Sequence, residues 1–347
     1  MVSLAFRRRI GAALAVSTGV LVVSAILAIS LGSVDVSFKD TVKIILYKIG
    51  LIDRGDWSAG TETIIHFVRV PRVLIAGEVG MALGISGAVM QGVFRNPMAD
   101  PGIIGVSAGA SLGAVTAIYT GFASLHLFAT PFAAFVGALV ATTLIRLVST
   151  VEGRASVSTL LLAGVAASAL FSAATSTILS FSNDYQMRQM VFWMMGGLSG
   201  RGYEHVYMIT APVLLGSAAM LVFARDLNVM LLGEEGARGV GVDPEVSNKI
   251  LLTLASLVTG AAVSVTGTIG FVGLIVPHIL RLIVGPDHRV LLPVSALGGA
   301  SFLILADLIA RVVARPIELQ VGIVTAFIGA PYFIYLLRRS QRQRGMI

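Results

Sequence analysis

Long apolar blocks separated by short polar turns make up almost the whole chain. Most of the blocks reach the roughly 20 residues that a helix needs to cross the hydrocarbon core of a bilayer. They lie near residues 10–31, 64–94, 102–121, 126–148, 157–182, 205–224, 249–266, 268–284, 290–313 and 316–337. The pattern predicts about ten transmembrane helices, while the two short blocks beside Gly267 leave eight or nine open. An even number puts both termini on one side of the membrane.

The composition assigns the fold class. Hydrophobic residues make up 56% of the 347 residues and charged residues 12%, and the mean hydropathy is +0.90. Soluble domains carry roughly 25% charged residues. We therefore expect an all-α integral membrane protein in which residues 1–347 form a single transmembrane domain.

Basic residues near the ends of the apolar blocks predict the orientation. Lys and Arg accumulate in cytoplasmic loops, and arginine clusters within residues 7–9 and 338–344 flank the first and last blocks. Both termini are therefore expected in the cytoplasm. Lys39, Lys43 and Lys48 would then lie outside, against the rule, but the terminal clusters outweigh them. The net charge of +7 comes from these span ends, not from one basic face for nucleic acid.

Sequence motifs argue against several other function classes. The chain has no GxxxxGK followed by Ser or Thr, so another subunit must bind ATP if ATP drives the function. It has no HExxH and no cysteine, which disfavours an intramembrane metalloenzyme and excludes thiolate metal sites. A secondary transporter is a weak alternative, because Glu78 is its only obvious ion-coupling carboxylate.

The second apolar block ends abruptly in a polar, proline-bearing turn. The turn is RNPMADPG, residues 95–102, and an apolar run resumes after it. Helix breakers at membrane depth are tolerated only where protein or a water-filled cavity satisfies the freed backbone groups. We therefore expect this turn to line a transport pathway.

Seven motifs follow one another in an order typical of one family. They are RVPR (69–72), GISGAVMQGVFRNPMADPGIIGVSAGA (84–110), LLLAGVA (160–166), GFVGLIVPHILR (270–281), DHRVLLP (287–293), LADLIAR (305–311) and VGIVTAFIGAPYFIYLL (321–337). In these motifs the chain resembles the FecCD-type membrane permeases of ABC importers for iron(III)-siderophores, haem and cobalamin.

The resemblance implies a transporter complex of several subunits. The functional unit would be a homodimer with ten helices per subunit and a path at the two-fold axis, in the cytoplasmic (inner) membrane of a prokaryote. Its partners would be two ATP-binding cassette ATPase subunits and one periplasmic or lipid-anchored substrate-binding protein. No cofactor is expected in this chain, since the ATPase would bind ATP and Mg.

The resemblance also gives three arginines a docking role. Arg69 and Arg72 lie at the outer start of the second span and Arg311 at the outer end of the ninth. The matching arginines of the family take up acidic residues of the binding protein, a task that suits the fixed fork of a guanidinium. Interfacial anchoring is the plain alternative. Asp307, four residues before Arg311, is expected to hold that side chain in place.

A cytoplasmic gate is implied at Asn96 and Met98 in the polar turn, and at Val157 and Ser158 before the fifth span. Neutral, moderately small side chains let a bulky ligand pass without being held by a charge. Val157 departs from the Ser or Thr of relatives, and ordinary loop residues are the alternative for all four.

The polar stretch 225–248, between the sixth and seventh spans, would supply the coupling helices that contact the ATPase. Residues 228–241 are expected to form two short helices around a glycine turn. The coupling residues implied are Gly233, Glu234, Glu235 and Arg238. The alternative is a plain cytoplasmic loop, which is polar in any case.

Two further ionisable residues lie in apolar blocks. Glu78 either lines the path or packs with a hydrogen-bonded partner, and His278, without a second ligand at metal spacing, favours a structural role. No metal site is expected. The family's breadth favours an iron(III)-siderophore as the substrate, then haem, then cobalamin, and specificity can rest largely with the binding protein.

Overall fold

The computed structural model describes the backbone of residues 4–151, 154–155 and 157–344. Side chains are described in these ranges except those of residues 4–9, 103, 150, 151, 154, 155, 157, 158, 234, 337 and 339–344. Within this part of the chain the fold is helical apart from one antiparallel pair of two-residue strands, β1 (Thr150–Val151) and β2 (Arg154–Ala155). The predicted all-helical class is therefore confirmed, with this one short addition.

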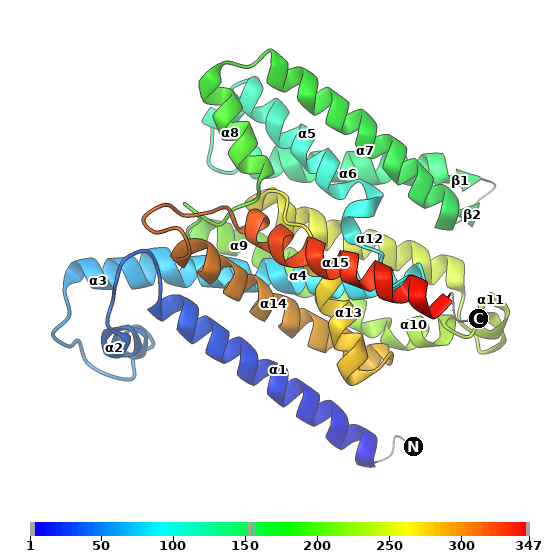
Figure 1. Ribbon diagram of the computed structural model, residues 1–347, viewed down its shortest axis with the longest axis horizontal. Coiled ribbons are helices and arrows are strands. Elements are labelled where there is room, and N and C mark those ends of the chain that lie inside the picture. Colours follow the sequence, from blue (N-terminus) through cyan, green and yellow to red (C-terminus); the bar gives the residue numbers. More distant parts are fainter. Residues whose placement is uncertain (1–3, 152–153, 156, 345–347) are drawn as a thin grey trace.

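The helices occur where the apolar pattern predicts them (Figure 1). Those made largely of apolar residues are α1 (Leu4–Ser30), α4 (Val70–Val93), α5 (Val106–Tyr119), α6 (Ala129–Ser149), α7 (Val157–Ser180), α9 (Tyr203–Val222), α12 (Pro244–Thr266), α13 (Val272–Val284), α14 (His288–Val312) and α15 (Val321–Arg344). Helix α4 continues an α3 (Ala59–Thr63) and a π-helical η1 (Ile64–Arg69), so that one helical rod runs from Ala59 to Val93.

Within the described residues, seven helices are long and apolar enough to cross a membrane: α1, the α3–η1–α4 rod, α6, α7, α9, α12 and α14. Helices α5, α13 and α15 are shorter apolar helices. The chain is thus a multi-pass membrane protein. Short connecting helices complete it: α2 (Phe38–Lys48), η2 (Pro101–Ile104), η3 (Phe122–Ser124), α8 (Asp184–Met194), α10 (Ala224–Met230) and α11 (Glu234–Gly239).

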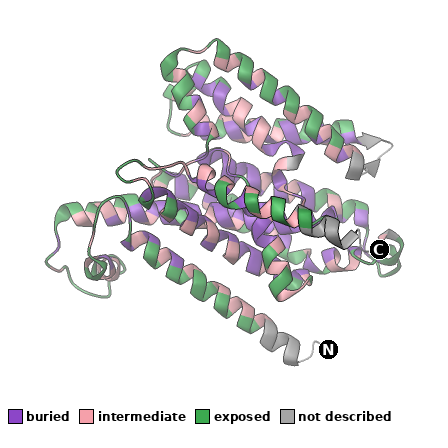
Figure 2. Cartoon of the chain, in the orientation of Figure 1, coloured by how far each residue is buried: buried purple, intermediate pink, exposed green. Residues whose placement is uncertain are grey.

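Helix α4 is the centre of the bundle and packs against α9, α12, α13 and α14. Most of its residues are buried, whereas α1 lies at the edge with much of its surface exposed (Figure 2). Small residues explain the close packing. A methyl group at Gly80 would overlap the backbone of Gly299 in α14, and one at Gly87 would overlap the backbone of Gly273 in α13.

Helices α5, α6, α7 and α8 form a second packet on one side of this centre (Figure 1). Helices α5 and α6 approach each other through Gly109 and Gly137, and α12 packs against both α4 and α6. Helix α1 begins and α15 ends at the same end of the bundle, together with α10, α11 and the β1–β2 pair. Helices α2 and α3 lie at the opposite end.

Candidate functional site

The three predicted docking arginines meet at the end of the bundle near α3, and we call Arg69, Arg72 and Arg311 the arginine cluster. They are 4%, 6% and 3% exposed. Arg69 donates hydrogen bonds to the carbonyl oxygens of Ile29 at 2.8 Å and Ser30 at 2.7 Å, at the carboxyl end of α1. Those carbonyls have no partner inside their own helix, so a guanidinium there caps α1.

The other two arginines share one buried carboxylate. Asp307 accepts from Arg72 at 2.9–3.1 Å and forms an ion pair with Arg311, Nε to Oδ2, at 3.0 Å. The predicted contact between Asp307 and Arg311 is therefore confirmed. Arg72 also pairs with Glu318 at 2.7 Å, and Arg311 donates to carbonyls of residues 28 and 31 in and just after α1. The cluster joins α1, α4 and α14, and its docking role stays a prediction.

The predicted gate turn starts from an orderly helix end. Arg95 N–H bonds to the Gly92 carbonyl and Asn96 N–H to the Gln91 carbonyl, both at 3.2 Å, which is the Schellman pattern. Arg95 takes the left-handed conformation, φ 46°, where glycine is usual. Asn96 Oδ1 then accepts from the Met98 N–H at 3.0 Å, so the exposed Asn96 side chain stiffens the turn.

The second predicted gate pair is placed only in part. Helix α7 begins at Val157, so Val157 and Ser158 lie in its first turn, but both side chains lie outside the described residues. A gate formed by these two residues with Asn96 and Met98 stays a prediction.

Two short helices flank a glycine turn, as predicted, but the first begins at Ala224, four residues before the expected range 228–241. Helices α10 and α11 flank Gly233, whose φ of 99° permits the turn between them. Glu235 and Arg238 are exposed on α11, and Arg238 pairs with Glu245 of α12 at 2.9 Å. The Glu234 side chain lies outside the described residues.

The contact between α10 and α14 has no counterpart among the predicted site residues. Asn228 Nδ2 donates to Asp287 Oδ1 at 2.6 Å, and Asn228 Oδ1 accepts from the His288 N–H at 2.8 Å. Burial raises the pKa of the Asp287 carboxyl, but hydrogen bonds from Arg289 and Asn228 outweigh burial and bring the pKa to about 2. An Asp directly before a helix is an N-cap signal, and it could have drawn attention to Asp287.

The two ionisable residues of the apolar blocks have protein neighbours. The Thr210 hydroxyl of α9 lies 2.7 Å from Glu78 Oε1, which supplies the hydrogen-bonded partner of the packing alternative. The His278 ring lies edge-on to Tyr332, with ring centres 6.3 Å apart. Among the residues described, no three His, Cys, Asp or Glu side chains gather where they could hold a metal ion.

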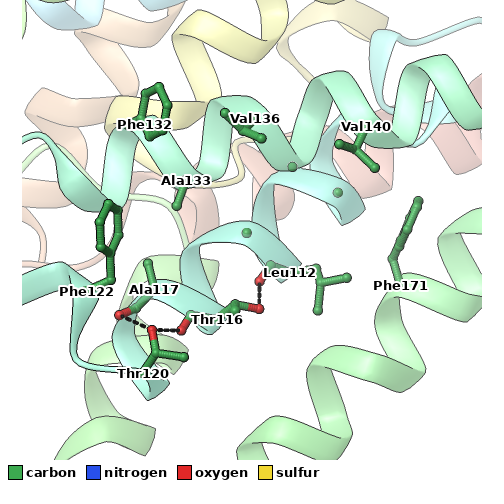
Figure 3. A pocket seen from close by; sticks show the side chains of 13 residues that line it. Leu112, Thr116, Ala117, Thr120, Phe122, Phe132, Ala133, Val136, Val140 and Phe171 are labelled. Atoms are coloured by element: carbon green, nitrogen blue, oxygen red, sulfur yellow. Dashed lines mark hydrogen bonds between the residues drawn. The ribbon is translucent and has the colours of Figure 1, made fainter.

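Two apolar hollows open on the side of the molecule that carries α5 to α8 and α15. The first, of about 510 Å³, lies between α5, α6 and Phe171 of α7 (Figure 3). The Thr116 and Thr120 hydroxyls in its wall bond to carbonyls of their own helix. The second, of about 590 Å³, lies between Met194, Thr268 and α15. The described linings contain no charged side chain and no His or Cys.

Comparison with known proteins agrees with the motifs. The model of the FecCD transport family matches residues 20–339. The chain is 50% identical over 277 residues to the cobalamin import system permease BtuC of Halobacterium salinarum, covering 80% of this chain and 74% of that protein. It is 42% identical over 281 residues to the hemin transport system permease HmuU of Yersinia pestis, covering 80% and 84%.

A solved structure has the same architecture. It is described as an inward-facing conformation of a metal-chelate type ABC transporter, and it superposes with a TM-score of 0.81 at 31% identity, over 94% of this chain and 98% of that one. The ten apolar helices, the polar turn after α4 and the two short helices around Gly233 thus occur in a chain that the family model matches nearly end to end. The chain belongs to the FecCD transport family of ABC importer permeases.

Proposed function

We propose that this chain is the permease subunit of an ATP-driven importer of a metal chelate in the cytoplasmic membrane of a prokaryote. The observation that carries the proposal is the family match over residues 20–339. The ten apolar helices would each cross the bilayer, and both termini would lie in the cytoplasm. ATP and Mg would bind only to the separate ATPase subunits. The end with α10 and α11 is then the cytoplasmic end, and the arginine cluster lies at the outer end.

We propose that two copies pair through the face that carries α7 and α15. Helix α7 is little buried within one chain and exposes Ser172, Ser176 and Thr177 among apolar residues. Hydroxyl groups at membrane depth find hydrogen-bond partners in a second subunit or a water-filled path, whereas lipid tails offer none. Phe327 of α15, 77% exposed, borders the second hollow on the same face. A path between the copies would be weakly polar, as a bulky chelate requires.

The names of two relatives bear on the substrate. The permeases from Halobacterium salinarum and Yersinia pestis are named for cobalamin and for hemin, both metal complexes of a tetrapyrrole-type ring. We therefore propose cobalamin first and haem second, ahead of the iron(III)-siderophore that the family's breadth favours. The test is uptake into liposomes that contain the chain, its ATPase and its binding protein, with each chelate in turn. Saturable uptake of a ferric siderophore but not of cobalamin or haem would overturn this order.

The arginine cluster should mark the docking site of the binding protein. We expect Arg311→Lys, which keeps the charge and loses the guanidinium fork, to weaken binding-protein association about tenfold, the equivalent of one charge-assisted hydrogen bond. Because Arg311 also holds α1, the variant must first elute from gel filtration as wild type does. Surface plasmon resonance with the immobilised binding protein gives the affinity. An unchanged affinity in a folded variant limits Arg311 to a structural role.

Charge reversal on α11 should uncouple ATP hydrolysis from transport. We expect Glu234→Lys together with Glu235→Lys to lower uptake at least about tenfold while the ATPase keeps hydrolysing, because like charges across an interface displace a partner. Uptake and phosphate release are measured on the same liposomes. Glu204→Lys, an exposed acid at the start of α9 near the outer end, is the control and should leave both rates unchanged. Normal coupling in the double variant would exclude this contact.

A further inference from the structure

The Asn228 side chain has one orientation because its partners fix it. Its Oδ1 accepts from the His288 backbone N–H, which can only donate, and its Nδ2 faces the Asp287 carboxylate, which can only accept. Asn228 Oδ1 also lies 2.9 Å from His288 Nδ1. That nitrogen must therefore carry a hydrogen, and the neutral imidazole keeps Nε2 as a lone pair. Three hydrogen bonds thus join α10 to the first turn of α14.

His288 continues this contact to α4. Its side chain is 2% exposed, and Nε2 has no hydrogen-bond partner among the described residues. A methyl group at Gly92 would lie 2.7 Å from His288 Nε2 and 2.9 Å from Leu227 Cδ2. Only glycine lets α4 pack so closely against α10 and α14 at this point. Gly92 is therefore in direct contact with both helices.

Gly92 belongs to the helix end that sets the gate turn. Its carbonyl accepts from Arg95 N–H, and the carbonyl of the preceding Gln91 accepts from Asn96 N–H. Asn96 lies four residues after Gly92, and its N–H bonds to the last turn of this helix. A displacement of the Gly92 turn therefore displaces Asn96.

We propose that Asn228, His288 and Gly92 form the mechanical link through which the coupling helices move the gate turn. This link rests on the proposed function, since it takes α10 and α11 as the surface that the ATPase pushes. The displacement of α10 passes through the three bonds of Asn228 to α14, and through the His288 and Leu227 contacts to the last turn of α4. Asn228 and His288 are positioning residues in this account.

A thiol at the gate turn makes the link measurable. The sequence has no cysteine, so Met98→Cys introduces a single labelling site. The complete transporter, with ATPase and binding protein in liposomes, is labelled with a maleimide in the presence and absence of ATP and vanadate. We expect the labelling rate of this parent to depend on nucleotide. Adding Asn228→Ala should abolish that dependence and lower the chelate imported per ATP hydrolysed about tenfold, within the range of ordinary allosteric couplings, while hydrolysis continues.

A matched control separates the link from a general loss of structure. Asn183→Ala removes the same kind of side chain from the N-cap of α8, where it accepts from Gln186 N–H at 2.9 Å. It should leave the nucleotide dependence of labelling and the import yield unchanged. Nucleotide-dependent labelling and normal yield in the Asn228→Ala protein would overturn the link. A wild-type transporter that does not import at all would contradict the proposed function itself, which is a different result.

A second variant covers the case in which Asn228→Ala does not fold. Gly92→Ala acts at the other end of the link, where the added methyl pushes the His288 and Leu227 side chains away from α4. Both neighbours are ends of side chains, so the fold can adjust. We expect the same loss of nucleotide-dependent labelling with hydrolysis retained. A normal response in the Gly92→Ala protein would overturn the link as well.

Discussion

Asp307→Ala is expected to lower the free energy of unfolding by about 3–5 kcal/mol, the usual cost of removing one partner from a buried ion pair. Asp307 is 1% exposed and is the carboxylate that Arg72 and Arg311 share. Without it, the partners that Arg311 keeps among the described residues are backbone carbonyls, and Arg72 keeps Glu318. Two guanidinium groups would then remain buried with one carboxylate fewer to offset the loss of their hydration. Chemical denaturation in detergent, followed by tryptophan fluorescence, measures the change.

Asp35→Ala is the matched control, because it removes an Arg–Asp pair at the same end of the molecule. Asp35 pairs with Arg315 at 3.2 Å, but its side chain is 96% exposed. Exposed pairs add little to stability because water and salt screen them. No measurable change is expected. Equal losses in the two variants would show that the buried carboxylate has no special role in holding α1, α4 and α14 together.

Gly87→Ala should also destabilise the protein, by about 3 kcal/mol, at the upper end of ordinary overpacking costs. A methyl group at Gly87 would overlap the carbonyl and Cα of Gly273 in α13. These are backbone atoms, so relief requires the two helices to separate. The same denaturation experiment measures the loss, and the yield of folded protein in the membrane gives a second readout.

Gly19→Ala tests whether the loss comes from this contact. Gly19 lies on α1, and no atom outside the adjoining turns of its own helix lies within 4 Å of the added methyl. Alanine there should be neutral or stabilise the helix by about 0.5–1 kcal/mol, because glycine loses more backbone entropy. If Gly87→Ala behaved like Gly19→Ala, the close approach of α4 and α13 described here would be wrong.

The sequence predicts the local features of this molecule well. Apolar blocks locate the apolar helices of the described residues, seven of which are long enough to cross a membrane, because membrane-spanning length leaves a simple composition signal. The two short helices around Gly233 follow from a glycine inside a polar stretch, and the contact between Asp307 and Arg311 follows from their i, i+4 spacing. Each of these depends on residues that are close in the chain.

Contacts between distant segments could not be predicted in the same way. Arg72 lies 235 positions from Asp307, and Asn228 lies 60 positions from His288. No local pattern indicates that η1 would cap the carboxyl end of α1 through Arg69. The arginines were expected at an outer surface for docking, and the structure gives them internal partners as well. The roles in docking, gating and coupling still derive from family resemblance, because partners and substrate decide them.

ATP-driven uptake decides whether this chain works as the permease of an ABC importer. The chain is reconstituted with its ATPase in liposomes, with the binding protein and labelled cobalamin on the outer-end side. We expect cobalamin to accumulate inside only when hydrolysable ATP is present on the cytoplasmic side and the binding protein is added. Accumulation driven by an ion gradient without ATP would contradict it and would favour a secondary transporter.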